Sequence, residues 1–432
     1  MKKYQEVLDY LYSQLPMYHR TGPAAYKDSL DNTYALDEMF SHPHLQFKCL
    51  HVAGTNGKGS VSHMLASVLQ EAGYKTGLYT SPHLKDFRER IRINGAMIPE
   101  EDVIRFVDIF RQKNEIAKIE PSFFELTVLM AFEYFRKENV DIAVIEVGLG
   151  GRLDSTNIIT PEVSVITNIS LDHTALLGNT IQLIAGEKAG IIKNAIPVVV
   201  GESSSEYNEV FIQKAKEKNA PIFFADKELS SDYSMLSTDG KQLISVSKDH
   251  APCFQNLKVD LIGIYQRKNI LSVLKTIELL NEIGWTIGRE AIYKGIENTS
   301  VNTGLMGRWQ IIGNNPLVVC DTGHNEGGIR QVVEQINQTA WKHLHIVFGM
   351  VNDKNIDPVL ELLPKNASYY FTHASIPRAM DEHELREMAL KFGISGKSYQ
   401  TVKEALVAAK ANAGEYDMIF IGGSTFVVAE VL

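Results

Sequence analysis

Short apolar runs alternate with amphipathic stretches along the first half of the chain. Residues 49–53 form an apolar run that stops at Gly54, and apolar residues then recur at helical spacing as far as Leu69. Gly73 marks the end of this predicted helix, and residues 76–80 form the next strand-like run. A strand, a helix and a second strand in this order predict a βαβ unit and favour a parallel sheet.

The same alternation continues beyond this unit. The pattern predicts a helix over residues 121–137, strands over 142–147 and 163–169, and a helix that ends near residue 192. Residues 227–260 are richer in Ser, Asp and Lys, and their short alternating runs predict small strands and loops at the edge of the first domain. A strongly amphipathic helix follows, with an apolar stripe of Ile270, Val273, Leu274, Ile277 and Leu280.

A second alternation of strands and helices begins after the polar, glycine-containing segment 298–307. It predicts strands over residues 317–320, 344–348, 369–372 and 418–421, with helices between them. We therefore predict an α/β protein with a boundary near Ser300. Residues 1–300 are expected to form a phosphate-loop domain with a mostly parallel sheet, and residues 301–432 a smaller, Rossmann-like α/β domain.

Composition limits the class of protein. With 432 residues, the chain has room for two to three domains of roughly 150 residues each. Hydrophobic residues make up 44% and charged residues 22%, as in an ordinary globular protein. The formal net charge of −9 repels nucleic acid and anionic lipid, so neither is an expected partner.

Cysteine usage and the apolar runs indicate the compartment. The three cysteines have no C-x-x-C spacing, which argues against a disulfide framework and against a thiolate zinc site. Glu6 and Asp9 interrupt the N-terminus before a signal-peptide core can form. No apolar run approaches the roughly 18 residues that a membrane span needs. We expect a cytoplasmic protein that acts as a monomer.

A glycine-rich loop between the first predicted strand and helix has the composition of a phosphate cradle. Its glycines let backbone N–H groups converge on phosphate oxygens, Lys58 supplies a cation, and the Ser60 hydroxyl can hold Mg²⁺. Val52 stands where the strict Walker pattern has its first glycine, and the alternative is a turn that only caps a helix. The predicted ATP-binding residues of this loop are Gly54, Thr55, Asn56, Gly57, Lys58, Gly59 and Ser60.

This loop resembles the ATP loop of the Mur ligase superfamily, in the branch that contains folylpolyglutamate synthase and dihydrofolate synthase. Further segments follow in that family's order: residues 80–84 resemble a segment whose serine, here Ser81, binds Mg²⁺, and residues 146–154 a block with a metal-binding glutamate, here Glu146. The resemblance implies Mur-ligase-like domains over 1–300, with ATP and folate sites, and over 301–432. It implies folate contacts at Ser122, Phe123, Phe124, Glu125, Leu153, Asp154 and Ser155.

Two of these positions also have an interpretation independent of the family. Glu146 stands in a strand just before Gly148, where an open α/β sheet places its ligand crevice, and the alternative is a buried ion pair with Arg152. His173 follows another strand; a lone loop histidine more often makes an ordinary hydrogen bond. The resemblance instead implies that His173 is a metal ligand.

Lys188 has two contrasting interpretations. Without the family, it is a helix lysine that pairs with Glu187 or faces solvent. The resemblance implies an N6-carboxylated lysine whose carbamate oxygens ligate a second Mg²⁺. Carbamate formation requires the neutral amine, so burial would favour it.

The second half of the chain adds candidates for the ATP site. The resemblance implies an adenine contact at Asn269 and ATP contacts at Arg308, Asp321 and His324. Three neighbours of the last two residues, Thr322, Gly323 and Glu326, differ from the family's usual residues, as does Met306 before Gly307. An Asx turn is the alternative for Asp321.

Together these motifs predict an ATP-dependent ligase that adds L-glutamate to the γ-carboxylate of a reduced folate through an acyl phosphate. ATP is the co-substrate, and two Mg²⁺ ions are expected on Ser60, Ser81, Glu146, His173 and carboxylated Lys188, with Lys58, His173 and Lys188 catalytic. The sequence leaves open whether dihydropteroate is also a substrate, because residues 26–31 do not clearly match the bifunctional pattern. The rival hypotheses are a muramyl-peptide ligase and a phosphate-loop NTPase switch without ligase activity; residues 122–125 favour a pterin over a UDP-sugar.

Overall fold

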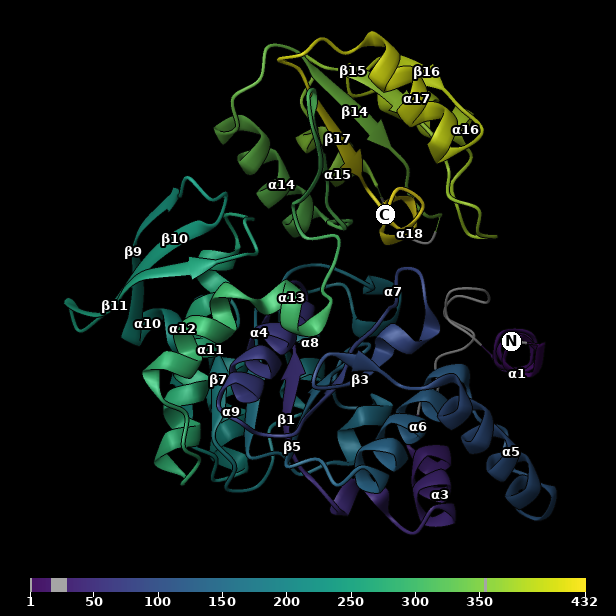
Figure 1. Ribbon diagram of the computed structural model, residues 1–432, viewed down its shortest axis with the longest axis vertical. Helices are drawn as coiled ribbons and strands as arrows, with labels where there is room; N and C mark the ends of the chain where they lie inside the picture. Colours follow the sequence, from purple (N-terminus) through teal and green to yellow (C-terminus); the bar gives the residue numbers. More distant parts are fainter. Residues whose placement is uncertain (1, 17–28, 353–355) are drawn as a thin grey trace. The chain divides into compact units, whose positions relative to one another are not determined.

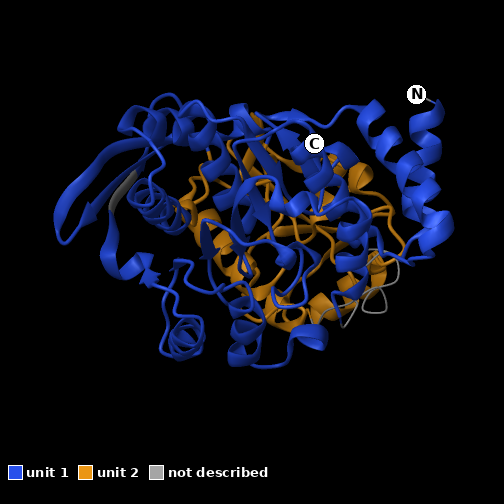
Figure 2. Cartoon of the chain, turned by 90° about the horizontal axis from the view of Figure 1, so that it is seen from below, with its two compact units in different colours: residues 1–169, 174–260, 267–304 blue, residues 170–173, 261–266, 305–432 orange. Residues whose placement is uncertain are grey.

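A computed structural model describes residues 2–16, 29–352 and 356–432 (Figure 1). The described chain separates into two compact units (Figure 2). Unit 1 takes its residues from 1–169, 174–260 and 267–304, and unit 2 from 170–173, 261–266 and 305–432. We predicted the domain boundary near Ser300, which lies in the short helix α13 (Thr299–Thr303). Unit 1 ends at Gly304, directly after this helix. Residues 26–28 of the segment 26–31 lie outside the described residues.

Unit 1 is built on an eight-stranded sheet in the order β4-β3-β2-β5-β1-β6-β7-β8. Neighbouring strands are parallel throughout the run β2-β5-β1-β6-β7-β8. Strands β3 and β4 extend the sheet beyond β2, and both of these pairings are antiparallel. The predicted mostly parallel sheet is therefore confirmed. The strands are β1 (Lys48–Ala53), β2 (Thr76–Tyr79), β3 (Ile91–Ile93), β4 (Ala96–Met97), β5 (Ile142–Glu146), β6 (Val163–Ile166), β7 (Val198–Val200) and β8 (Ile222–Phe224).

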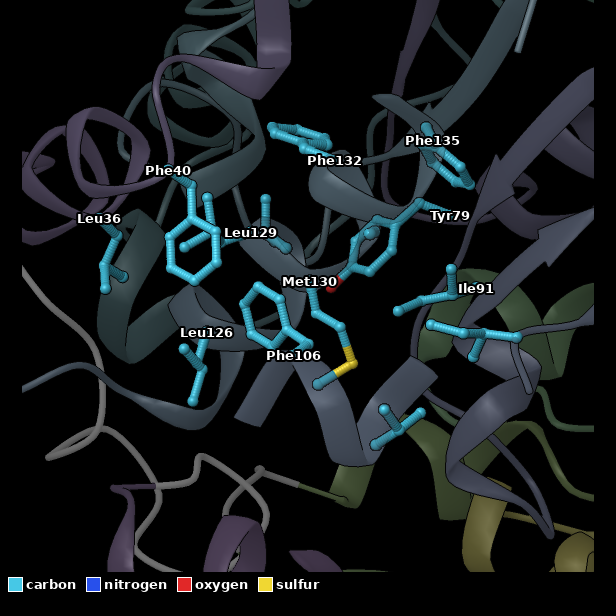
Figure 3. Close-up of a cluster of buried hydrophobic side chains, with 14 of the residues drawn as sticks. Leu36, Phe40, Tyr79, Ile91, Phe106, Leu126, Leu129, Met130, Phe132 and Phe135 are labelled. Carbon is cyan, nitrogen blue, oxygen red and sulfur yellow. The ribbon is translucent and has the colours of Figure 1, made fainter. Parts of the chain in front are cut away.

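Helices surround this sheet, and apolar side chains fill the space between the layers. On one side, Figure 3 shows Leu36 of α3 and Phe40, the residue that follows this helix, beside Phe106 of α5 and the buried face of α6. The helices of this part are α1 (Lys2–Gln14), α3 (Asp31–Met39), α4 (Lys58–Glu71), α5 (Glu100–Ala117), α6 (Phe123–Lys137), α7 (Thr174–Leu177), α8 (Ile181–Ala189), α9 (Asn208–Glu217) and α10 (Ala225–Glu228). Short 3₁₀ turns are η2 (Pro43–Leu45), η3 (Phe87–Arg90) and η4 (Ser155–Ile158).

The polar stretch 227–260 forms a separate antiparallel sheet of three strands in the order β11-β10-β9. These strands, β9 (Leu229–Leu236), β10 (Gln242–Lys248) and β11 (Ala251–Val259), are longer than the small strands and loops that we predicted. The predicted amphipathic helix follows as α11 (Gln266–Glu282), and its apolar stripe is buried. Helix α12 (Arg289–Glu297) packs against α4 before the chain leaves unit 1.

Unit 2 has a six-stranded sheet in the order β12-β13-β17-β14-β15-β16, with β12 antiparallel to β13 and the other pairs parallel. The predicted strands correspond to β13 (Leu317–Cys320), β14 (Leu344–Phe348), β15 (Ser368–Phe371) and β17 (Met418–Gly422). The two edge strands, β12 (Gln310–Asn314) and β16 (Gly396–Ser398), were not predicted, because an edge strand with few buried side chains needs no apolar run. The helices are α14 (Glu326–Gln338), α15 (Asp357–Leu362), α16 (Glu382–Leu390), α17 (Val402–Asn412) and α18 (Thr425–Ala429).

Within the described residues, no helix combines the length and the apolar character that crossing a membrane requires.

Candidate active site

The glycine-rich loop joins β1 to α4 in a conformation that only glycine accepts at two positions. Gly54 has φ +148°, and a Cβ added there would lie 1.8 Å from Thr167 Oγ1. Gly57 has φ +83°, and its Cβ would lie 2.4 Å from Asn269 Oδ1. Gly57 is also the N-cap of α4, so this helix begins at Lys58 without a capping side chain. The structure thus brings predicted ATP-binding residue Asn269, from α11, against the loop.

Polar residues that directly follow the neighbouring strand β6 hold the glycine-rich loop by hydrogen bonds. The Thr55 N–H donates to the Asn168 carbonyl oxygen, and the Asn56 N–H donates to Asn168 Oδ1, both at 2.9 Å. The Thr167 hydroxyl donates to the Asn56 carbonyl at 2.6 Å. Asn168 Nδ2 in turn donates to Glu202 at 3.0 Å. Sequence reasoning missed these three supporting residues, because only the sheet order places the end of β6 beside the end of β1.

Lys58 lies over the loop that precedes it. Its ammonium group donates to the carbonyl oxygens of Gly54 and Thr55, each at 3.0 Å. Gly59 and Ser60 are buried in the first turn of α4. A cation therefore stands at the uncapped N-terminus of a helix, and both features favour an anion at this position.

Two predicted metal ligands meet on the other side of β1. Glu146 ends β5, which pairs directly with both β1 and β2, and its side chain is buried. Its Oε2 accepts the Ser81 N–H at 3.0 Å, because Ser81 follows β2 at the same edge of the sheet. Arg152, the alternative partner of Glu146, pairs with Glu187 at 2.9 Å. The structure thus brings Ser81 and Glu146 together at the end of the sheet that carries the loop.

Lys188 is a buried residue, with 3% of its surface exposed. Its ammonium group donates to the Gly54 carbonyl at 2.9 Å, so it reaches the glycine-rich loop from α8. The interpretation as a solvated lysine is therefore wrong, and Glu187 is occupied by Arg152. A Cβ at Gly151 would lie 2.7 Å from the Glu187 carbonyl oxygen, so a glycine lets the loop after β5 approach the backbone of α8.

His173 belongs to the short segment that groups with unit 2, whereas Ser81, Glu146 and Lys188 belong to unit 1. The His173 N–H donates to Asp172 Oδ1 at 2.8 Å, and φ of His173 is +49°. Within unit 2, Asn325 Nδ2 donates to Asp172 Oδ2 at 2.8 Å, and His324 Nε2 lies 3.6 Å from the same oxygen. Asp172, which sequence reasoning did not select, therefore links the His173 segment to the loop after β13.

Asp321, which follows directly from the last residue of β13, is buried and accepts three hydrogen bonds. It accepts from the Tyr265 hydroxyl at 2.6 Å and from the Trp309 N–H at 2.7 Å. Its Oδ1 accepts the Gly323 N–H at 2.7 Å, which is the Asx-turn contact that we considered as the alternative. Burial raises the pKa of Asp321, and these hydrogen bonds oppose the shift. Arg308 donates to the Thr322 hydroxyl in the same loop.

The segment 122–125 begins α6 with a capping box. The Ser122 N–H donates to Glu125 Oε2 at 2.6 Å, and the Glu125 N–H donates to Ser122 Oγ at 3.2 Å. Phe123 is buried against Phe87 in the core. Phe124 is half-buried, and a Cβ at Gly148 would lie 2.4 Å from its ring. Phe124 therefore lies against the loop that follows Glu146.

The second predicted folate segment is a tightly bonded turn. Asp154 caps η4 and accepts from the N–H groups of Thr156 and Leu149, each at 2.9 Å. Burial raises the pKa of Asp154, and these hydrogen bonds lower it. Leu153 is half-buried and Ser155 is buried. Asp154 thus shapes the loop after β5 through its own hydrogen bonds.

Two known domain families match the chain, one over a range that lies mostly in unit 1 and one over a range within unit 2. Residues 52–277 match the Mur ligase middle domain, and residues 307–425 match the glutamate ligase domain of Mur ligases. The chain is 32% identical over 422 residues to the dihydrofolate synthase/folylpolyglutamate synthase of Bacillus subtilis, covering 94% of both chains. A longer bifunctional folylpolyglutamate synthase/dihydropteroate synthase of Haloferax volcanii is 32% identical over 413 residues, 92% of this chain, and the chain spans 48% of its length.

A solved structure extends the likeness to three dimensions. The Escherichia coli protein FolC, in complex with DHPP and ADP, superimposes with a TM-score of 0.84 at 30% identity. The alignment covers 99% of this chain and 96% of that one. The chain belongs to the Mur ligase family, in the branch of the folylpolyglutamate and dihydrofolate synthases.

Proposed function

We propose that this chain is an ATP-dependent ligase that joins the amine of L-glutamate to the γ-carboxylate of a reduced folate. The observation that carries the proposal lies at one end of the unit 1 sheet. There a glycine-rich loop with Lys58 adjoins the half-buried Ser81 and the buried Glu146, which are hydrogen-bonded to each other, and the buried Lys188 contacts Gly54. The names of the relatives, which contain folylpolyglutamate and dihydrofolate synthases, supply the substrate class.

The reaction requires activation of a carboxylate, which is a poor electrophile. The γ-phosphoryl group of ATP moves to a carboxylate oxygen, so that a P–O bond to ADP breaks and a P–O bond to the folate forms. The glutamate amine then attacks the acyl carbon of this acyl phosphate; phosphate leaves and a proton is lost from the amine. Phosphoryl transfer is accelerated chiefly by positioning and by neutralising charge.

The chain's own groups provide this positioning. The uncapped first turn of α4 and Lys58 would hold the phosphate oxygens, while Asn168 and Thr167 keep the loop in shape. Asn269 would contact the adenine beside Gly57. In unit 2 we assign ATP contacts to Arg308, Asp321 and His324.

The donor atoms also fit Mg²⁺, which prefers carboxylate and hydroxyl oxygens. Ser60, Ser81 and the buried Glu146 would hold one ion, and His173 with a carboxylated Lys188 would hold a second. Burial of Lys188 supports the carbamate, because a buried amine favours its uncharged form. Bound there, Mg²⁺ would neutralise charge on the phosphoryl group during transfer.

Folate would bind beside the loop after β5. Phe124 offers a half-buried aromatic face there, and Leu153 is also half-buried. The other predicted contacts, Ser122, Phe123, Glu125, Asp154 and Ser155, would shape this site, since most of them are engaged in the capping box, the core and the η4 turn. The name of the Bacillus subtilis relative, which includes dihydrofolate synthase, supports testing dihydropteroate as a second substrate.

The test is ADP release by the full chain with ATP, Mg²⁺ and a panel of acceptors. The panel contains reduced folates, dihydropteroate and a UDP-muramyl peptide, each with and without L-glutamate. We expect release that requires both a folate and glutamate, and a folate product heavier by one glutamyl residue in mass spectrometry. Release that is independent of glutamate would favour an NTPase switch and contradict the proposal. Monomeric state and cytoplasmic location remain predictions.

A further inference from the structure

A carboxylate and two imidazoles meet in unit 1, in the segment that precedes β1. Asp37 lies in α3, His42 in the turn after this helix, and His44 in η2. One potential ligand atom from each residue lies within 4.8 Å of the other two. Among the described residues, this is the one group of three His, Cys, Asp or Glu side chains with that spacing.

The three side chains converge through the two oxygens of a single carboxylate. His42 Nδ1 lies 2.7 Å from Asp37 Oδ2, and His44 Nδ1 lies 2.7 Å from Asp37 Oδ1. The exposed fraction of the side chain rises from 1% at Asp37 to 12% at His44 and 52% at His42. Asp37 and His44 therefore form the largely buried floor of the cluster, and His42 is the potential ligand on its solvent-exposed side.

The backbone holds these groups in place. Leu36 and Phe40, on either side of Asp37, are buried against α5 and α6, as Figure 3 shows. Ser41 and His42 have φ values of +62° and +55°, an unusual pair of left-handed residues, and the His42 N–H donates to the Asp37 carbonyl at 2.8 Å. This turn brings His42 back over Asp37.

The charge of the cluster suits a cation. Asp37 contributes an acidic side chain, and each of its two oxygens faces an imidazole nitrogen. A carboxylate beside two imidazoles is a donor set for a divalent cation. The proposed ligase function uses none of these residues, because they precede the amino end of β1 and the phosphate loop follows its carboxyl end.

We propose that Asp37, His42 and His44 bind a divalent transition-metal ion of the Zn²⁺ class. Imidazole nitrogen with carboxylate oxygen is a donor set that Zn²⁺ accepts, whereas Mg²⁺ prefers oxygen alone. Ligand atoms at about 2.1 Å from a tetrahedral Zn²⁺ lie about 3.4 Å from one another. The imidazole nitrogens lie 2.7 Å from the Asp37 oxygens, and the three candidate ligand atoms lie within 4.8 Å of one another, so metal binding would lengthen the two hydrogen-bonded contacts. The solvent side next to His42 leaves a fourth position for water.

A bound ion would tie the end of α3 to the segment that leads into β1. Its binding energy would add to the stability of the folded chain, because the unfolded chain does not hold the three ligands together. The site would be structural, and separate from the Mg²⁺ sites of the proposed ligase reaction.

The first experiment is calorimetric titration of the metal-free full chain with ZnCl₂, in buffer with excess Mg²⁺ to occupy oxygen-rich sites. His42→Ala removes the exposed ligand and leaves the buried floor intact. His383→Ala is the matched control, because His383 is 62% exposed and lies beside the buried carboxylate of Glu382 in unit 2. We expect the wild type and His383→Ala to share one site that His42→Ala loses or binds at least about tenfold more weakly.

The second experiment uses Co²⁺ as a spectroscopic probe, because substitution of the nearly buried His44 risks misfolding. Imidazole ligation at a four-coordinate site should give visible absorption in the wild type that is reduced in His42→Ala. Zn²⁺ should also raise the melting temperature of the wild type more than that of His42→Ala. Equal Zn²⁺ affinity, Co²⁺ absorption and melting shift in the two chains would show that the cluster is only a hydrogen-bonded clamp, and would overturn the proposal. Glutamate-dependent ADP release, measured in parallel, should be the same in both chains.

Discussion

In unit 1, the loop between β1 and α4 ends in Gly57, and Lys58 is the first residue of the helix. In unit 2, the loop between β13 and α14 starts at Asp321 and ends in Asn325. Both loops follow a parallel strand and lead into a helix. The first takes its shape from glycines at positive φ and from a neighbouring strand. The second is shaped by its own side chains: Asn325 Oδ1 accepts the Gly328 N–H at 2.8 Å and so caps α14.

The same topological position, a connection from a strand to a helix, therefore presents different groups in the two units. A helix N-terminus carries partial positive charge, and an anion can use it when no side chain caps it. The loop of unit 1 keeps its helix uncapped by side chains and adds a cation. The loop of unit 2 caps its helix and offers a buried carboxylate and an imidazole, groups that suit hydroxyl and amine donors rather than phosphate.

Removing the cation of the first loop should have the largest effect. We expect Lys58→Ala to lower kcat by at least about 100-fold, because the charge that offsets the transferring phosphoryl group is lost. The fold should persist, since a half-buried lysine adds little to the apolar core. Steady-state ADP release measures the loss, and Lys214→Ala on the surface of α9 is the control. Near-wild-type turnover at saturating ATP would show that this loop does not hold the phosphates.

Substitutions of Lys188 test whether its side chain acts as a carbamate that holds a metal ion beside the first loop. Lys188→Ala should lower kcat by orders of magnitude if the carboxylated side chain holds a second metal ion. A short-chain carboxylic acid added to Lys188→Ala should restore part of the activity, because it supplies the missing oxygens. Lys188→Arg should stay inactive, because it keeps a cation that cannot be carboxylated. An active Lys188→Arg enzyme would contradict the carbamate.

Asn168 tests whether the first loop depends on the neighbouring strand for its shape. Asn168→Ala removes the side-chain oxygen that accepts the Asn56 N–H and the amide that reaches Glu202. We expect KM for ATP to rise about fivefold, because the loss of one positioning hydrogen bond costs on the order of 1 kcal/mol. The change in kcat should be smaller. An unchanged KM for ATP would mean that the glycines alone hold the loop.

Removing the helix cap from the loop of unit 2 should lower the stability of the fold. Asn325→Ala removes the cap of α14 and the buried hydrogen bond to Asp172, so the free energy of unfolding should fall by about 1–2 kcal/mol in urea titration. Asp381→Ala, which removes the exposed cap of α16, is the matched control and should cost less. Equal losses would show that the Asp172 contact contributes nothing to stability.

Local sequence patterns predicted much of the fold. Central strands such as β14 and β17 are buried on both faces and are therefore continuous apolar runs. The edge strands β12 and β16 were not predicted from the sequence, because few of their side chains are buried and they therefore form no apolar run. The segment that begins at Ser122 matched the family's pterin-site pattern, and the structure adds that Ser122 and Glu125 form a capping box.

The glycine-rich loop could be recognised from the sequence alone, because its glycines, lysine and flanking elements are neighbours along the chain. Which distant groups surround the loop depends on the tertiary structure. The order β5-β1-β6 brings Glu146 and Asn168 to either side of Gly54, and the packing of α8 buries Lys188 against the same loop. Sheet order and helix packing depend on contacts far apart in sequence, and short-range periodicity carries no record of them. The return of His42 over Asp37 likewise depends on two left-handed residues that composition does not reveal.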